Sequence, residues 1–221
     1  GGVLSTICMP SKNDTKKRKK SVHPVDAVYL EGLRSVLVAL SDDSLVHVPL
    51  MAMTSSSPSL GSDKLSISAN IDMGQLERCA WGIPILSVST MGTVADGRTA
   101  CLVRTADAVA TVMLATASSS PSLPVGELKL GKVLCASSHR SGHISALVAS
   151  AKKGSPKLLL SWRSPTEGWL STDAATACAV GEAMEGYEAV GAYASLNCTF
   201  ITLRSSNGAK DGQCFRLLKC G

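Results

Sequence analysis

The sequence lacks any long apolar run and any secretory leader. No stretch approaches the roughly 18 consecutive apolar residues that indicate a membrane-spanning helix. The N-terminus does not pair a basic segment with an apolar one either. These absences favour a soluble protein that is neither secreted nor attached to a membrane. Charged residues are also scarce, at 18% against 45% apolar residues, and this balance favours a packed globule over a disordered chain.

Net positive charge is missing from most of the chain. The net charge is +5, and the stretch from Lys12 to Lys20 holds six basic residues against one acid, Asp14, which accounts for all of it. The remaining chain is therefore neutral. A neutral body lacks the basic face that phosphate neutralisation requires, so we do not expect it to bind DNA or RNA.

Residues 1–22 are polar, rich in lysine and without apolar periodicity, which predicts a flexible basic leader. Such a basic run is typical of a nuclear-import signal or of an RNA-phosphate contact, and a merely solvated linker is the alternative. The run consists of Lys16, Lys17, Arg18, Lys19 and Lys20. RNA contact, if it occurs, is expected through this leader only.

The eight cysteines are irregularly spaced, and several, such as Cys101 and Cys135, lie inside apolar runs. A reduced cysteine in such a run behaves as a small buried hydrophobic residue. We therefore expect reduced thiols and a nuclear or cytoplasmic protein. Glycosylation sequons at Asn13 and Asn197 and the even cysteine count leave a second interpretation open, a secreted or cell-surface β domain with disulfides.

Local signatures of catalysis are missing as well. The sequence has four histidines and many serines, but no Gly-x-Ser-x-Gly nucleophile elbow. The paired Asp42 and Asp43 are better explained as turn stabilisers than as acid and base. We expect no enzyme activity and no cofactor, with a hydrolase assembled from distant loops as the remaining alternative.

One arrangement resembles a metal site. Cys135, His139 and His143 are spaced by four residues, which brings ligands together on a helix. Here the surrounding residues predict a strand, a serine-rich turn and another strand, where this spacing does not converge. No fourth ligand is identified, so no metal site is predicted.

From residue 23 onward, short runs rich in Val, Leu, Ile, Ala and Thr alternate with Gly, Asp, Ser and Pro. Apolar runs of this length between turn-forming residues predict strands, and their density predicts an all-β protein. Only two weak helix candidates are present, residues 73–82 and residues 180–190, and glycines weaken the second.

Two segments repeat the same pattern. "SVLVALSDDSLVHVPL" (35–50) aligns with "TACLVRTADAVATVML" (99–114) at a shift of 64 residues, and "SSSPSL" recurs at 55–60 and 118–123. Each copy predicts a strand, an Asp-containing turn and a returning strand. An upstream strand and a short downstream strand ("KLSISAN" at 64–70, "GELKLG" at 126–131) complete a four-stranded unit. Two looser copies follow in residues 132–162 and 187–220, so the chain contains an internal repeat.

The segment "HPVDAVYLEGLRSVLVALSDDSLVHVPL" resembles a degenerate WD40 blade, in which an Asp turn precedes the third strand. Val48-Pro49 and Val112-Met113 stand where a standard blade has Trp-Asp. The resemblance implies a partial or degenerate β-propeller of about four four-stranded blades. The predicted blades span approximately residues 23–80, 81–131, 132–180 and 181–221. Four blades are at the low end of ring closure, so further blades from another segment or subunit are expected.

The resemblance also implies a function. WD40-like propellers are scaffolds that bind other proteins, and the basic leader makes this chain similar to the divergent propellers of nuclear, nucleolar and ribosome-assembly complexes. The expected role is a non-catalytic scaffold in such a multi-subunit ribonucleoprotein assembly. The Ser-Pro steps at Ser57 and Ser120 are candidate phosphorylation sites beside a docking surface, or parts of ordinary surface loops. Trp162 is expected in the core, with an exposed binding anchor as the alternative.

Overall fold

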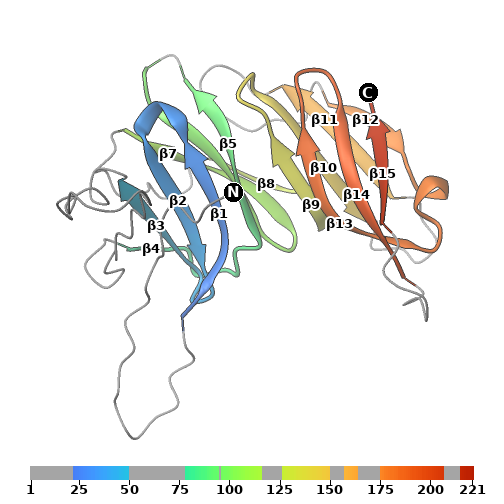
Figure 1. The fold of residues 1–221 in the computed structure, drawn as a ribbon, viewed down its shortest axis with the longest axis horizontal. Coiled ribbons are helices and arrows are strands. Elements are labelled where there is room, and N and C mark those ends of the chain that lie inside the picture. The colour runs from blue at the N-terminus through green and yellow to red at the C-terminus, as the bar shows by residue number, and fades with distance from the viewer. Residues whose placement is uncertain are drawn as a thin grey trace, which may run out of the picture.

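Four antiparallel sheets follow one another along the chain (Figure 1). The computed structural model describes residues 22–49, 78–94, 96–115, 126–149, 157–163, 175–206 and 215–221. Within these ranges each sheet is a meander, in which every strand pairs with the strands before and after it in sequence. This local pairing follows from short strands joined by turns. We refer to the sheets as blades 1 to 4.

Blades 1 and 2 each contain four strands. Blade 1 consists of β1 (Pro24–Leu30), β2 (Ser35–Leu40), β3 (Ser44–Pro49) and β4 (Arg78–Ala80). Blade 2 consists of β5 (Ser87–Thr93), β6 (Thr99–Arg104), β7 (Ala108–Leu114) and β8 (Gly126–Lys129). The Asp turn between β2 and β3 forms as predicted, because Asp43 adopts the left-handed conformation (φ 62°) and donates its N–H to the Leu40 carbonyl at 3.2 Å.

Blades 3 and 4 differ in their number of described strands. Blade 3 consists of β9 (Lys132–Ser138), β10 (His143–Ala149), β11 (Leu158–Arg163) and β12 (Thr176–Ala179). Blade 4 consists of β13 (Tyr187–Ala194), β14 (Thr199–Ser205) and β15 (Phe215–Cys220). Two 3-10 turns, η1 (Glu31–Leu33) and η3 (Glu182–Met184), precede β2 and β13. Among the described residues, no strand therefore pairs with the outer edge of β15.

The first strands of the blades lie next to one another. β1 contacts β5, β5 contacts β9, and β9 contacts β13, whereas β13 and β1 make no comparable contact among the described residues. Figure 1 shows the first blade, mostly blue, on the left and the orange-to-red fourth blade on the right. The four blades thus form an open arc of a propeller.

Among the described residues, three apolar clusters hold the arc together, one between each pair of neighbouring blades. Each cluster fills the space between two sheet faces, because side chains alternate between the faces along every strand. The clusters include Leu37 and Cys101 for blades 1 and 2, Leu102 and Ile144 for blades 2 and 3, and Leu147 and Ile201 for blades 3 and 4. We call the face that points toward the next blade in sequence the downstream face.

The structure confirms the predicted all-β fold of small antiparallel sheets arranged as four propeller blades. It also confirms the repeated hairpins, as β2–β3 and β6–β7. The fourth strand predicted at 126–131 is β8. The one predicted at 64–70 lies outside the described residues, and β4 takes that place in blade 1.

Both helix candidates are wrong where the structure describes them. Residues 78–80 form β4, and the rest of the first candidate up to residue 77 is not described. In the second candidate only the single turn η3 is helical, and β13 begins at Tyr187. Gly186 has φ 73°, a left-handed conformation that ends the turn. No helix in the described ranges is long and apolar enough to cross a membrane.

Candidate protein-interaction surface

Each of the four histidines forms a hydrogen bond with a serine hydroxyl. In blade 1, His47 Nε2 lies 2.6 Å from Ser35 Oγ, and both side chains are buried. In blade 3, His143 Nε2 lies 2.6 Å from Ser161 Oγ, and its Nδ1 lies 2.5 Å from the carbonyl oxygen of Ser195 in blade 4. His143 is therefore fixed within blade 3 through Nε2 and linked to blade 4 through Nδ1, which is a structural role.

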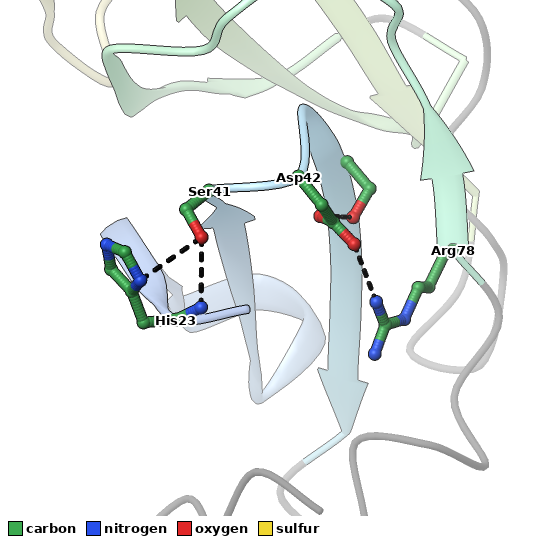
Figure 2. Close-up of polar contacts among 5 residues, drawn as sticks. His23, Ser41, Asp42 and Arg78 are labelled. Atoms are coloured by element: carbon green, nitrogen blue, oxygen red, sulfur yellow. Dashed lines mark hydrogen bonds and ion pairs between the residues drawn. The ribbon is translucent and has the colours of Figure 1, made fainter. Parts of the chain in front are cut away.

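The polar residues at the β2–β3 turn are also engaged in structural contacts (Figure 2). His23 donates its backbone N–H to Ser41 Oγ at 3.0 Å, and the same hydroxyl lies 3.2 Å from the ring Nδ1. Asp42 accepts a hydrogen bond from Ser44 Oγ and pairs with Arg78 of β4, with 2.7 Å between Arg78 Nη1 and Asp42 Oδ2. Asp42 thus ties β4 to the turn, in agreement with the turn role predicted for it.

The spacing of Cys135, His139 and His143 does not produce a cluster of ligands. His139 bonds Ser141 within its own turn, His143 points toward blade 4, and Cys135 packs in the core between blades 3 and 4. Among the described residues, no group of three or more Cys, His, Asp or Glu side chains is placed to hold a metal ion.

The six described cysteines are free thiols. Burial raises the pKa of Cys101 to about 12 and that of Cys135 to about 11, because a low-dielectric core disfavours the thiolate. These two residues are therefore inert packing groups, as their apolar sequence context predicted. Cys8 and Cys214 lie outside the described residues.

The downstream face of blade 4 is the most exposed apolar surface among the described strands. Tyr193, Phe215 and Leu217 are 62%, 56% and 67% exposed. Phe215, Leu217 and Lys219 alternate along β15, and strand pairing sets them beside Arg204, Thr202 and Phe200 of β14. Tyr193 pairs with Phe200 from the other side. These residues lie on one face because cross-strand partners share a face.

The opposite face of blade 4 is closed. Ile201 and Leu203 of β14 pack against Leu147 and Leu159 of blade 3. Most soluble proteins keep large aromatic and aliphatic side chains from clustering in water unless a partner covers them. The downstream face of blade 4 is therefore the best candidate for a protein-binding surface.

Sequence reasoning missed this surface. The alternation of Phe215, Leu217 and Lys219 was visible in the sequence, but an apolar strand face reads the same whether a neighbour covers it or not. Several of the residues predicted to function lie outside the described ranges, so their roles stay predictions. These are Lys16, Lys17, Arg18, Lys19, Lys20, Ser57 and Ser120. The side chain of Trp162 also lies outside the description, although its backbone belongs to β11.

Comparison with known proteins finds structural neighbours of low sequence identity. No family model matches the sequence, and no curated protein matches it. Among solved structures the chain is similar to the WD40 repeats of RRP9, with 11% identity and a TM-score of 0.49 over 90% of this chain and 52% of that chain. It is also similar to U3-55K, with 11% identity and a TM-score of 0.47 over 90% of this chain and 53% of that one.

The chain thus spans about half the length of each of these two structures. The chain's own four antiparallel meanders, packed side by side through their first strands, confirm the predicted propeller-blade fold. Any function has to be argued from this chain's own surface, because a shared fold does not fix a function.

Proposed function

We propose that this chain is a non-catalytic propeller scaffold that holds other protein subunits within a nuclear or nucleolar multi-subunit assembly. The observation that carries the proposal is the exposed downstream face of blade 4, where Tyr193, Phe215 and Leu217 project into solvent. Clusters of exposed aromatic and aliphatic side chains with a polar rim are typical of protein-binding sites. Glu188, Arg204 and Lys219 supply that rim.

The polar residues of the blades support a scaffold rather than a catalyst. The histidines bond serine hydroxyls or a backbone carbonyl, and Asp42 is engaged by Arg78 and Ser44. A catalytic triad needs a histidine placed between a nucleophile and a carboxylate. These hydrogen bonds and this ion pair stabilise turns and contacts between blades instead.

In this proposal residues 1–22 act as a basic leader and residues 23–221 form the blades. The five consecutive basic residues from Lys16 to Lys20 would serve nuclear import or contact RNA phosphates. Ribosome biogenesis is the most specific setting that we propose, from the resemblance of the chain to the divergent propellers of ribosome-assembly complexes. Phosphorylation of Ser57 and Ser120 would adjust partner binding by adding charge.

The size of the particle that contains the chain tests the scaffold proposal. The full chain, tagged and expressed at native level, is isolated from nuclear extract and weighed by native mass spectrometry. We expect a particle much heavier than the 22.9 kDa of the chain alone. A free monomer throughout the extract would contradict the proposal.

A leader variant separates location from assembly. Replacing the five basic residues from Lys16 to Lys20 by serine should move the chain out of the nucleus, as seen by microscopy. The variant should still enter the same particle in vitro, because the blades are unchanged. Replacing Lys152 and Lys153 by serine is the matched control and should leave the chain in the nucleus.

A further inference from the structure

The downstream faces of blades 1 to 3 are all covered by the next blade. In blade 2, Ala100 and Leu102 of β6 are each 1% exposed because they pack against Val133 and Ile144 of blade 3. In blade 3, Leu147 is fully buried against blade 4. Three consecutive interfaces therefore use the same element, a sheet face closed by the following sheet.

The same strand positions exist in blade 4 but have no described cover. Phe200 and Thr202 of β14 take the places that Ala100 and Leu102 take in β6, since both pairs lie on the downstream face of the second strand. Beside them, Leu217 remains 67% exposed. Within the described residues, the repeating geometry thus leaves the downstream face of blade 4 open.

Arg104 shows how a downstream face binds the blade that covers it. In blade 2, Arg104 donates from Nε to Ser87 Oγ of β5 at 3.0 Å and from Nη1 to the Leu134 carbonyl oxygen of blade 3 at 3.0 Å. Its guanidinium thus joins its own first strand to the backbone of the next blade. This contact is specific, because a planar guanidinium can serve two acceptors at once.

Blade 4 contains the same contact between an arginine and its own first strand, but among the described residues no following blade accepts a hydrogen bond from this arginine. Arg204 lies on the downstream face of β14, pairs in register with Glu188 of β13, and donates to the Glu188 carboxylate from Nε and Nη2. No described carbonyl accepts from its Nη1. Arg204 is therefore placed to donate to the backbone of a sheet that would follow blade 4, as Arg104 does to β9.

The charge of the face indicates the partner's chemistry. Arg204 and Lys219 give two positive groups against the one carboxylate of Glu188. Two copies of this face would bring four cations together against two carboxylates. A second copy could not extend the arc by its blade 1 either, because Val38, Leu40, Val46 and Val48 on the upstream side of that blade are already fully buried.

We infer that the downstream face of blade 4 docks a further antiparallel β-blade carried by a different polypeptide. Its apolar face would cover Tyr193, Phe215 and Leu217, its first strand would present backbone carbonyls to Arg204, and an acidic side chain would lie near Lys219. This inference rests on the proposed scaffold function and names the surface and the partner's structure.

Site-specific photocross-linking of the full chain in its own cells tests the inference. A benzophenone amino acid replaces Leu217, and in a second strain it replaces Tyr29, an exposed residue of β1. We expect one discrete adduct from position 217, with a cross-linked peptide that lies in a β-strand of another protein, and no such adduct from position 29. Adding Arg204→Leu should lower the yield of the adduct from position 217 at least fivefold. Adding Arg98→Leu, which removes an arginine in an ion pair on blade 2, should leave this yield unchanged.

Other results would overturn the inference. An adduct to another segment of the same polypeptide, between two copies of this chain, to nucleic acid or to a non-β segment contradicts it, and so does a yield that Arg204→Leu leaves unchanged. If the chain runs in a large particle and position 217 forms no discrete adduct, the inference fails while the scaffold proposal stands. If the chain is a free monomer, both fail.

Discussion

At the scale of single residues, the fit between neighbouring blades depends on positions where two backbones approach closely. Gly92 in β5 has φ 96°, and a Cβ atom built there would lie 2.5 Å from the carbonyl oxygen of Arg140 in the β9–β10 turn. The same region is tied by Ser138, whose hydroxyl donates to the Thr90 carbonyl at 2.8 Å. A side chain at position 92 would therefore separate blades 2 and 3 as well as strain its own backbone.

Gly92→Ala is predicted to lower the free energy of unfolding by about 2 kcal/mol, since left-handed strain and a backbone clash add together. Urea unfolding followed by tryptophan fluorescence measures this change. Gly97→Ala is the control, because Gly97 has φ 84° but open space around its Cβ position. Equal losses in the two variants would mean that the blade contact contributes nothing.

Thiol reactivity gives a second prediction at this scale. Iodoacetamide at pH 8 should label the exposed Cys178 and leave Cys101 and Cys135 unmodified, because burial holds their pKa at about 12 and about 11. An unfolded Cys101 thiol loses its proton from its ordinary pKa of 9.0, whereas the folded one stays protonated until about 12. Stability should therefore fall as the pH rises through this range.

Peptide mass spectrometry after timed labelling checks this expectation. In 6 M guanidinium chloride all three thiols should react at similar rates. Labelling of native Cys101 as fast as Cys178 would show that the core between blades 1 and 2 is open.

At the scale of elements, Arg104 forms a polar link between blades 2 and 3. It reaches from β6 to the β9 carbonyl oxygens of Leu134 and Val133, at 3.0 Å and 3.4 Å. Burial lowers its pKa, and the hydrogen bonds compensate the guanidinium for lost water. A long apolar side chain could replace its volume but not these bonds.

Arg104→Leu is predicted to destabilise the chain by about 2 kcal/mol, in the range of hydrogen bonds that involve a charged group. Thermal or urea unfolding measures the change, and Arg98→Leu at the exposed β5–β6 turn should have no measurable effect. A neutral result for Arg104→Leu would contradict both its role in blade 2 and the analogy with Arg204.

Strand order and turn positions could be predicted from the sequence. Which neighbouring blade each strand residue faces could not. The shift of 64 residues aligns Leu37 with Cys101 and Ala39 with Val103. In the structure all four lie in one cluster between blades 1 and 2, so the aligned residues face each other instead of pointing the same way around the arc. Since side chains alternate with a period of two, one residue of difference in register reverses the face.

The register difference is visible in the hairpins. Ala39 pairs with Leu45 across β2–β3, whereas the aligned Val103 pairs with Ala110, one residue beyond the position that the alignment gives. A bulge between Thr90 and Gly92 adds a further shift in blade 2. Such one-residue offsets arise from turn and bulge geometry that residue types alone do not determine.

At the scale of the whole molecule, the arc has one closed end and one open end among its described residues. The upstream side of blade 1 is buried at Val38 and Val46, while the downstream face of blade 4 exposes Tyr193 and Leu217. The exposure of the blade 4 face depends on which sheets pack together, so it could not be predicted from local sequence. It is the basis for assigning partner binding to blade 4.

Hydrogen–deuterium exchange on the free chain and on the chain in its native particle tests this assignment most directly. A docked sheet would hinder opening of the strand beneath it, so the amides of β15 (Phe215–Cys220) should exchange at least tenfold more slowly in the particle, while those of β2 (Ser35–Leu40) should not change. Unchanged exchange in β15, with new protection confined to other blades, would contradict partner binding at this face.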